Sequence, residues 1–426
     1  MNSSSRAGHR LSSDAAARLR RKRYAADRRL RWFGIAAIGA AVLLLGTLVT
    51  SIVMTGLPAF KQTHIALDVQ LDPERIDREN LFRARYEAVL RDALGSLFPD
   101  VEGRAQRALN AMISGGAQFV LRDMVVANPS WVGETVRVEL PVSDPFDQLA
   151  KGNISRDTPE RFRRVSDQQI AWFDALNADG RISQPFNWGL FFNADSRFPE
   201  LAGLSGAIVG SFYALLVCFL LSFPIGIAAA IYLEEFAPKN RWTDLIEVNI
   251  NNLAAVPSVV FGLLGLAVFL GWFGLPRSAP LVGGMVLALM TLPTMIIVTR
   301  AALKAVPPSI REAALGIGAS KHEMVLHHVL PLAIPGILTG TIIGLAQALG
   351  ETAPLLLIGM NAFITSPPGG ILDSSTALPT QIFIWADSPE RGFVARTSAG
   401  IMVLLGFLLL MNAVAIFLRQ RFERRW

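Results

Sequence analysis

The chain has 426 residues, of which 52% are hydrophobic and only 17% are charged, and its formal net charge is +6. Soluble domains carry about 25% charged residues, so this composition excludes an ordinary soluble protein and favours a membrane protein. Residues 57–200 hold 17 basic and 21 acidic side chains, so the basic excess lies in the rest of the chain. That distribution fits membrane orientation better than nucleic-acid binding, and we expect no nucleic-acid partner.

Six stretches are apolar and long enough to cross a bilayer. The first follows a basic segment, residues 1–31. It exceeds the apolar core of a secretory signal and precedes no small-residue cleavage pattern, which predicts an uncleaved anchor over residues 32–56. Residues 201–426 then form a core with five spans. The predicted spans are Trp32–Thr55, Leu204–Leu233, Leu253–Phe273, Leu281–Leu303, Leu332–Met360 and Ala399–Leu418.

Lys and Arg near the ends of spans predict which side faces the cytoplasm. Residues 1–31 hold ten of them and residues 419–426 hold four, while the loops 234–252 and 304–331 hold two and three. The short loops on the other side contain only Arg277, Arg391 and Arg396. We therefore expect both termini in the cytoplasm and residues 57–200 outside it.

The apolar pattern of the insert at residues 57–200 predicts a small α/β domain. Apolar residues alternate in "HIALDVQLD" from His64 and in "ETVRVELPV" from Glu134, which is the period of a strand. A helical stripe runs between them from Leu81 to Leu94, and residues 158–177 predict a second helix before an Asp-Gly turn. His64 is the only histidine of the insert, and no catalytic constellation is present there, so its role stays open.

The stretch "SIREAALGIGASKHEMVLHHVLP" at 309–331 is a polar hairpin between two apolar spans. Ser309 with Glu312, and Ser320 with Glu323, have the spacing of capping boxes, so each pair predicts a helix start. Gly318 between them permits a left-handed turn, and Pro331 predicts the end of the second helix. Two specified helices exceed what a connecting loop needs, and we interpret the hairpin as a rigid docking element.

The hairpin resembles the EAA motif of ABC importer permeases. The resemblance rests on Glu312-Ala313-Ala314, on Gly318, and on Leu330-Pro331, whereas His328 replaces a usual aliphatic residue. It implies a type I importer permease core of helices in the bacterial inner membrane. It also implies that Ser309, Glu312, Ala313, Ala314, Gly318, Ser320 and Glu323 form or support a coupling helix, within residues 309–330, that fits a cleft on a separate ATPase.

Three further stretches narrow the resemblance. "NNLAAVPSVVFGLLGL" at 251–266, "GETAPLLLIG" at 350–359 and "LPTQIFIWADSP" at 378–389 are similar to permease subunits of phosphate-specific ABC importers. The similarity covers residues 204–418. It implies three protein partners besides membrane lipid: a second permease subunit, an ATPase dimer and a periplasmic phosphate-binding protein. No G-x-x-x-x-G-K-[ST] motif is present, so we expect no enzyme activity or cofactor in this chain, with ATP and Mg on the ATPase.

Polar residues inside spans are costly and often lie on a transport route. Glu351 falls inside the predicted fifth span beside Thr352, with Gln347 one helical turn earlier, and Arg300 lies near the end of the fourth. Arg300, or an Arg of the second permease, is a candidate partner for the Glu351 carboxylate, and these four residues are the candidate translocation path. Alternatively, Arg300 extends to lipid headgroups and Glu351 makes a structural hydrogen bond.

Pro257 and Pro354 also lie within predicted spans, where a missing N–H predicts a bend. His322, His327 and His328 lack the spacing that brings ligands together on one helix face, so we expect no metal site. Two other functions remain open: a permease for another oxyanion such as sulfate or phosphonate, and a membrane-anchored sensor or scaffold. Short cytoplasmic segments disfavour the sensor.

Overall fold

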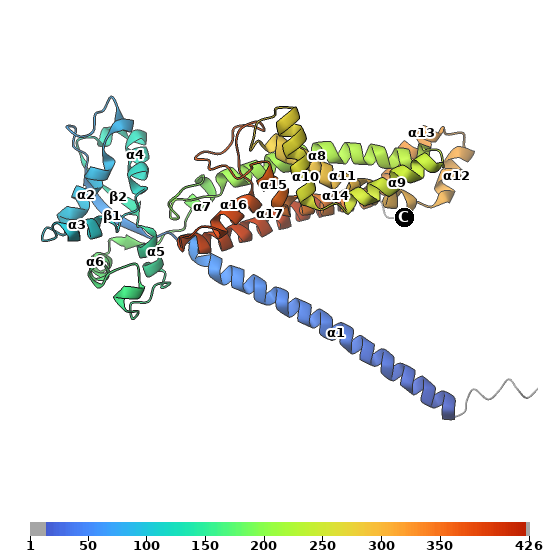
Figure 1. Ribbon diagram of the computed structural model, residues 1–426, viewed down its shortest axis with the longest axis horizontal. Coiled ribbons are helices and arrows are strands. Elements are labelled where there is room, and N and C mark those ends of the chain that lie inside the picture. The colour runs from blue at the N-terminus through green and yellow to red at the C-terminus, as the bar shows by residue number, and fades with distance from the viewer. Residues whose placement is uncertain (1–13, 423–426) are drawn as a thin grey trace, which may run out of the picture. The chain divides into compact units, whose positions relative to one another are not determined.

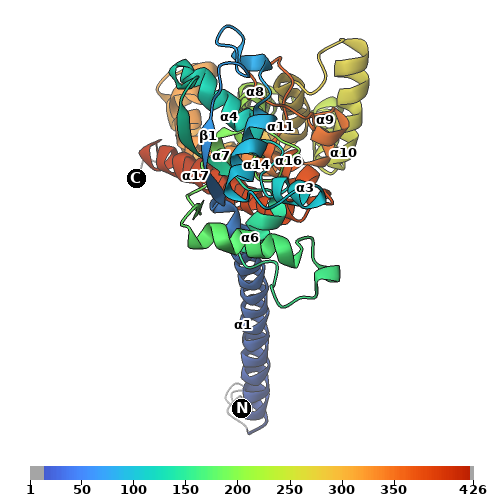
Figure 2. The same ribbon diagram turned by 90° about the vertical axis from the view of Figure 1, so that its left-hand side faces the viewer.

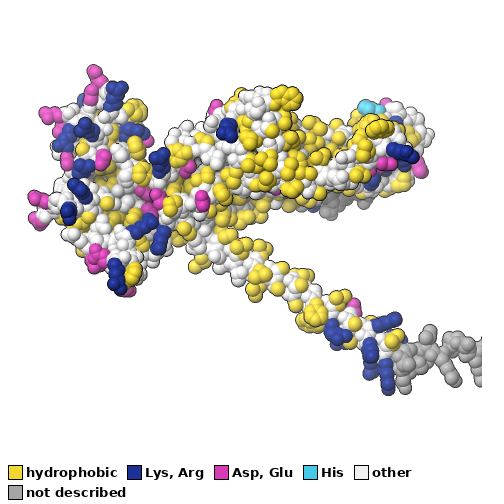
Figure 3. Space-filling model, in the orientation of Figure 1, with side chains coloured by type: hydrophobic (Ala, Val, Ile, Leu, Met, Phe, Trp, Pro, Cys, Tyr) yellow, Lys and Arg dark blue, Asp and Glu magenta, His cyan; other side chains and the backbone are white. Residues whose placement is uncertain are grey.

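The computed structural model describes residues 14–422. The ends of the predicted N- and C-terminal segments, residues 1–13 and 423–426, lie outside the described residues. The chain divides into two units, Met1–Met54 and Thr55–Trp426. Helix α1 (Asp14–Gly56) contains both the basic run and the first predicted span in one helix. Its basic side chains cluster near its beginning and apolar ones follow (Figure 3), the arrangement expected of a membrane anchor.

The insert contains a three-stranded antiparallel sheet in the order β2-β1-β3. Strands β1 (His64–Gln70) and β2 (Thr135–Pro141) lie where the alternation predicts them and pair with Leu67 opposite Val138. Helices cover the face of this sheet that carries Ile65, Leu67 and Val69 (Figure 2), and sheet and helices together bury one apolar cluster. The remaining elements are β3 (Ile182–Ser183), α2 (Tyr86–Leu97), α3 (Arg104–Asn110), α4 (Ala117–Ala127), α5 (Asp144–Ala150), α6 (Asp167–Ala178) and α7 (Gly189–Phe192).

Both helices predicted in the insert begin later than the apolar pattern indicates. Leu81 lies in a short 3-10 turn, and α2 begins at Tyr86. The prediction of a helix over 158–177 is wrong for its first part, because α6 begins at Asp167. Ser166 caps it there by exchanging hydrogen bonds with Gln169. A capping box fixes a helix start more strongly than an upstream polar pattern.

The core contains four long helices at predicted spans: α8 (Ser205–Ile231), α11 (Pro280–Lys304), α14 (Leu330–Gly350) and α17 (Gly392–Phe422). A π-helical segment, η5 (Tyr232–Phe236), continues α8. Helices α8 and α11 pack side by side (Figure 1). A Cβ atom at Gly284 would lie 2.6 Å from the Ala214 carbonyl oxygen, so only glycine permits this approach. Small residues at helix contacts are typical of membrane proteins, where lipid removes the hydrophobic drive to associate.

The third predicted span, Leu253–Phe273, is wrong as a single straight helix. Helix α9 (Arg241–Ala254) ends two residues into this span, and the chain bends by 102° before α10 (Ser258–Leu264) begins. Helix α10 then continues directly as the π-helical segment η6 (Gly265–Trp272). Proline restricts the residue before it to extended conformations, which accounts for a break just ahead of Pro257. The described residues hold five helices able to span a membrane, or up to six if this bent pair counts as one.

The fifth predicted span, Leu332–Met360, is wrong at both ends. Its helix begins at Lys321 and stops at Gly350, and a separate short helix, α15 (Ala353–Leu357), follows. Pro331 does not end a helix, because the π-helical segment η7 (Met324–Val329) runs directly into α14. The wider turn of the π-helical segment lets the helix continue through Pro331, although proline has no N–H to donate within the helix. The last helix of the core before α17 is α16 (Leu378–Ala386).

Candidate functional site

The hairpin at 309–331 forms a helix, a glycine turn and a second helix. Helix α12 (Pro308–Gly316) leads to Gly318, whose φ of +91° is left-handed. Helix α13 (Lys321–Glu323) then begins with the predicted capping box: Glu323 N–H donates to Ser320 Oγ (3.3 Å), and Ser320 N–H donates to the Glu323 carboxylate (2.8 Å). Local hydrogen bonds thus fix the second half of the hairpin.

The first predicted capping box, between Ser309 and Glu312, does not form. Helix α12 begins at Pro308, with Pro307 as its N-cap and no side-chain cap. A proline at the first helical position has a φ suited to the helix and no N–H to satisfy. It therefore starts the helix one residue before Ser309 could cap it.

Helix α12 has one packed face and one exposed face. Ala314 is buried against the end of α11 and the following segment η7, in a cluster with Leu303, Val306 and Met324. Glu312 and Ala313 are exposed. Leu315 and Ile317, both apolar, are 48% and 81% exposed. The exposed part of the hairpin therefore presents two apolar side chains next to a carboxylate.

The sequence analysis missed Arg311, which joins the packed face to two other helices. Its guanidinium donates to Glu235 Oε1 at 2.8 and 3.2 Å. It also donates to the carbonyl oxygens of Leu303 (2.9 Å) and Val306 (2.7 Å), at the end of α11. One feature of the sequence could have pointed to a partner for Arg311. This is the acidic pair Glu234–Glu235, which departs from the basic character expected of a cytoplasmic loop.

Arg300 does not pair with Glu351. Its guanidinium contacts Glu234 Oε2 at 3.3 Å and Glu247 Oε1 at 2.6 Å. Lys304 Nζ also lies 3.6 Å from Glu234. These partners lie on η5 and α9, so the prediction of an Arg300–Glu351 pair is wrong. Two carboxylates of the loop at 234–252 thus take the place of the one predicted from another span.

The other proposed path residues lie at the break between α14 and α15. Gln347 is exposed on the last turns of α14, Glu351 follows the end of that helix, and Thr352 is the N-cap of α15. The helix stops at Gly350, so Glu351 is its C-cap and follows Gln347 by one turn. Pro354 is buried at the beginning of α15. Glu351 is partly exposed, so the break presents a carboxylate, an amide and a hydroxyl within one short segment.

The structure brings together the three stretches at 251–266, 350–359 and 378–389. Helix α10 contacts α15 so closely that a Cβ atom at Gly262 would lie 2.7 Å from Pro354 Cα. Beyond α15, Thr380 Oγ1 donates to the Met360 carbonyl oxygen at 2.7 Å. Thr380 and Gln381 are both buried at the beginning of α16. Pro257 lies at the N-cap of α10, on the bend.

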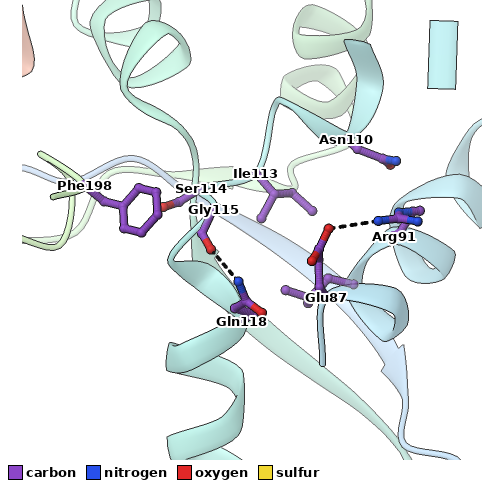
Figure 4. A pocket seen from close by; sticks show the side chains of 9 residues that line it. Glu87, Arg91, Asn110, Ile113, Ser114, Gly115, Gln118 and Phe198 are labelled. Carbon is purple, nitrogen blue, oxygen red and sulfur yellow. Dashed lines mark hydrogen bonds and ion pairs between the residues drawn. The ribbon is translucent and has the colours of Figure 1, made fainter. Parts of the chain in front are cut away.

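A separate pocket of about 330 Å³ lies in the insert (Figure 4). Its lining includes the exposed ion pair between Arg91 and Glu87 (2.8 Å), and Phe198 closes one side. None of the predicted site residues lines it. Burial lowers the pKa of His64 elsewhere in the insert below its usual value, which agrees with a structural histidine.

Comparisons with known proteins identify the core. Residues 222–426 match the family described as binding-protein-dependent transport system inner membrane component, and residues 16–160 match a domain of unknown function, DUF3333. The phosphate transport system permease protein PstA of Yersinia pestis is 34% identical, over 51% of this chain and 74% of that protein. PstA 2 of Mycobacterium tuberculosis is 32% identical, over 57% of this chain and 79% of that protein.

Other matches cover less of the chain or have lower sequence identity. The probable ABC transporter permease protein YqgI of Bacillus subtilis is 35% identical over 39% of this chain, and the match spans 55% of that protein. Among solved structures, an inward-facing MetNI methionine ABC transporter aligns with a TM-score of 0.40 and 17% identity, over 51% of this chain and 97% of that one. Because each of the two PstA matches covers more than two thirds of the relative, this multi-pass inner membrane protein belongs to the PstA family of phosphate transport system permeases.

Proposed function

We propose that the chain is one permease subunit of an ATP-driven phosphate importer, and that it forms half of the translocation path. The observation that carries the proposal is the docking hairpin within a PstA-family core. Its α12 is fixed to the core on one face, and Leu315 on α12 and Ile317 just after it are exposed. This arrangement suits a subunit that is moved by a separate motor.

The proposed partners are a second permease subunit, an ATPase dimer that binds ATP and Mg, and a periplasmic phosphate-binding protein. The basic run at the beginning of α1 supports a cytoplasmic N-terminus. Arg419 and Arg421 at the end of α17 support a cytoplasmic C-terminus. The insert, which lies between the first two spans in the sequence, is then periplasmic.

We place the path for phosphate along the break at Glu351. Gln347 and Thr352 offer hydrogen-bond donors, whereas an ionised Glu351 offers none to an anion. With Arg300 occupied by Glu234 and Glu247, the proposed partner of Glu351 is an Arg of the second permease. That pair would hold two subunits together across the path and lend its cation to phosphate during inward opening.

A Glu351→Gln variant tests this path, because it keeps the side-chain shape and removes the charge. We expect the complex to assemble and phosphate uptake to fall by about tenfold, the loss expected for one charge-assisted contact of 1–2 kcal/mol. Glu102→Gln, at an exposed position of the insert, is the matched control. Uptake by Glu351→Gln equal to that of wild type would leave Glu351 a structural residue only.

The function itself is tested by solute uptake into vesicles that contain the complete complex and ATP. Labelled phosphate, sulfate and a phosphonate are offered separately. Uptake of phosphate above the other two, dependent on ATP and on this chain, is the expected result. Preference for sulfate or the phosphonate would assign the permease to another oxyanion. Absence of ATP-dependent uptake of all three would favour a sensor or scaffold.

A further inference from the structure

The ion pair between Arg311 and Glu235 lies where the docking hairpin meets the rest of the core. Arg311 is on α12, next to the exposed Glu312 in the sequence, and its side chain reaches the end of α11. Glu235 is on the π-helical segment η5, which continues α8. The Glu235 side chain is only 7% exposed and that of Arg311 21%. A nearly buried carboxylate depends on its partner, since an unpaired buried charge is strongly destabilising.

Arg311 connects three helices through one guanidinium. Two of its hydrogen bonds go to Glu235 and two to the carbonyl oxygens of Leu303 and Val306. Carbonyl groups at the end of a helix lack partners within that helix and carry partial negative charge. Arg311 therefore caps α11 while it also holds the end of α8. The planar fork of Arg permits this combination, and a Lys ammonium would not reproduce it.

A second set of ion pairs lies beside the first. Glu234, next to Glu235, contacts Arg300 and Lys304 on α11, and Arg300 also contacts Glu247 on α9. Neighbouring carboxylates of η5 thus hold two elements, α12 through Arg311 and α11 through Arg300. The hairpin cannot shift without moving η5 or breaking the Arg311–Glu235 pair.

We infer that Arg311 and Glu235 are positioning residues that pass movement of the docking hairpin to the end of α8. This inference rests on the proposed function. In the proposed complex, the ATPase moves the exposed face of α12. Arg311, on the other side of α12, passes this movement to Glu235. The pair acts through the helices it joins and touches neither the ATPase nor phosphate.

The test uses the complete complex with Arg311→Met, which keeps the aliphatic length and removes the fork. Hydrogen exchange is measured with and without nucleotide over α12 and over residues 228–236. In wild type we expect nucleotide to change exchange in both segments. In Arg311→Met we expect the change in α12 to persist and the change at 228–236 to be lost. Phosphate taken up per ATP hydrolysed should fall by about tenfold, within the usual range of coupling between sites.

Three further variants complete the experiment. Arg277→Met removes an exposed Arg from another loop of the core and should behave as wild type. Arg311→Lys keeps the charge and should transmit partially, which keeps the test open if Arg311→Met does not assemble. Glu235→Gln keeps the side-chain shape and removes the charge at the other end of the pair, so it should lose transmission as Arg311→Met does.

The exchange measurement does not depend on the solute. A wild-type complex without phosphate uptake would contradict the proposed function, while its exchange would still decide the role of Arg311. Persistence of the nucleotide-dependent change at 228–236 in both Arg311→Met and Arg311→Lys would overturn the inference. Absence of that change in wild type would overturn it as well.

Discussion

The two ends of α8 are held by different interactions. Near its beginning, Ser211 Oγ accepts a hydrogen bond from the N–H of Leu378 (2.8 Å), and a Cβ atom at Gly210 would clash with Ser375. Near its other end, Glu234 and Glu235 form ion pairs with α11 and α12. We call the region of α15, α16 and the beginning of α8 the fixed end, and the region of η5 and α12 the docking end.

The difference fits the proposed function, in which the docking end moves and the fixed end does not. The contacts of Ser211 with Leu378 and of Gly210 with Ser375 are uncharged, buried and close, so a displacement there leaves polar groups without partners. The contacts at the docking end are ion pairs, and charge attraction falls off gradually with distance and tolerates several geometries. Motion imposed at α12 can thus reach α8 without disrupting the opposite end. Each prediction below perturbs one end and has a control that should leave it intact.

The largest expected effect is that of Gly262→Ala at the fixed end. The added Cβ would lie 2.7 Å from Pro354 Cα and 2.9 Å from Leu357 Cδ1, and a backbone atom cannot move aside cheaply. We expect a loss of about 3 kcal/mol of stability, as for an overpacked core, seen as a lower melting temperature of the purified chain. Gly271→Ala, whose Cβ would have its nearest contact at 3.5 Å, is the control. Equal melting temperatures would show that α10 and α15 separate freely.

Thr380→Val should cost somewhat less. The Thr380 hydroxyl lies 2.7 Å from the Met360 carbonyl oxygen and accepts from the Ala377 N–H at 2.9 Å. Valine keeps the shape but leaves that buried N–H without its acceptor, at a cost of about 2 kcal/mol. Thr397→Val loses only a bond within its own helix and should melt near wild type. A Thr380→Val chain as stable as that control would mean that the fixed end is not held by these bonds.

Gly318→Val perturbs the docking end. Its φ of +91° is unfavourable for any residue with a Cβ, and left-handed backbone costs a branched residue about 1–2 kcal/mol. We expect normal membrane insertion but uptake uncoupled from ATP hydrolysis in the complete complex. Gly316→Val adds the same side chain to equally open space without a positive φ, so it should transport better. Normal coupling in Gly318→Val would exclude a role for the turn.

The smallest effect separates the two predicted capping boxes. Ser320 accepts from the Glu323 N–H, so Ser320→Ala should destabilise the hairpin by about 1 kcal/mol. Ser309 caps no helix, so Ser309→Ala should change the stability of the hairpin much less than Ser320→Ala does. Hydrogen exchange of the hairpin amides measures both. A larger effect at Ser309 would reverse the assignment of the helix start.

Local patterns in the sequence predicted the parts of the fold that depend on local chemistry. Hydropathy placed α1, α8, α11 and α17, and the Ser320–Glu323 spacing placed α13. Hydropathy failed at Pro257 and at Glu351, because an apolar composition continues across a break in the backbone. At both places a proline lies next to the break or just beyond it, and a proline alone does not specify how far a helix turns.

Tertiary partners were beyond local patterns. Arg311 and Glu235 are 76 residues apart in the sequence, and no spacing rule connects them. Arg300 was recognised as unusual, but its partner was misplaced because the sequence offered several carboxylates and no distances. The contact between Gly262 and Pro354 was equally hidden, although both lie in stretches that resemble phosphate importer permeases. Motifs therefore marked the segments that resemble known permeases, while the contacts between these segments required the fold.

The contrast between the two ends is tested most directly by site-specific photo-crosslinking in the complete complex. A photoreactive residue replaces Ile317 at the docking end or Phe363 near the fixed end, which are 81% and 53% exposed. We predict an adduct with the ATPase from position 317 and none from position 363. An ATPase adduct from position 363, or none from position 317 in a complex that hydrolyses ATP, would contradict the assignment of α12 as the docking helix.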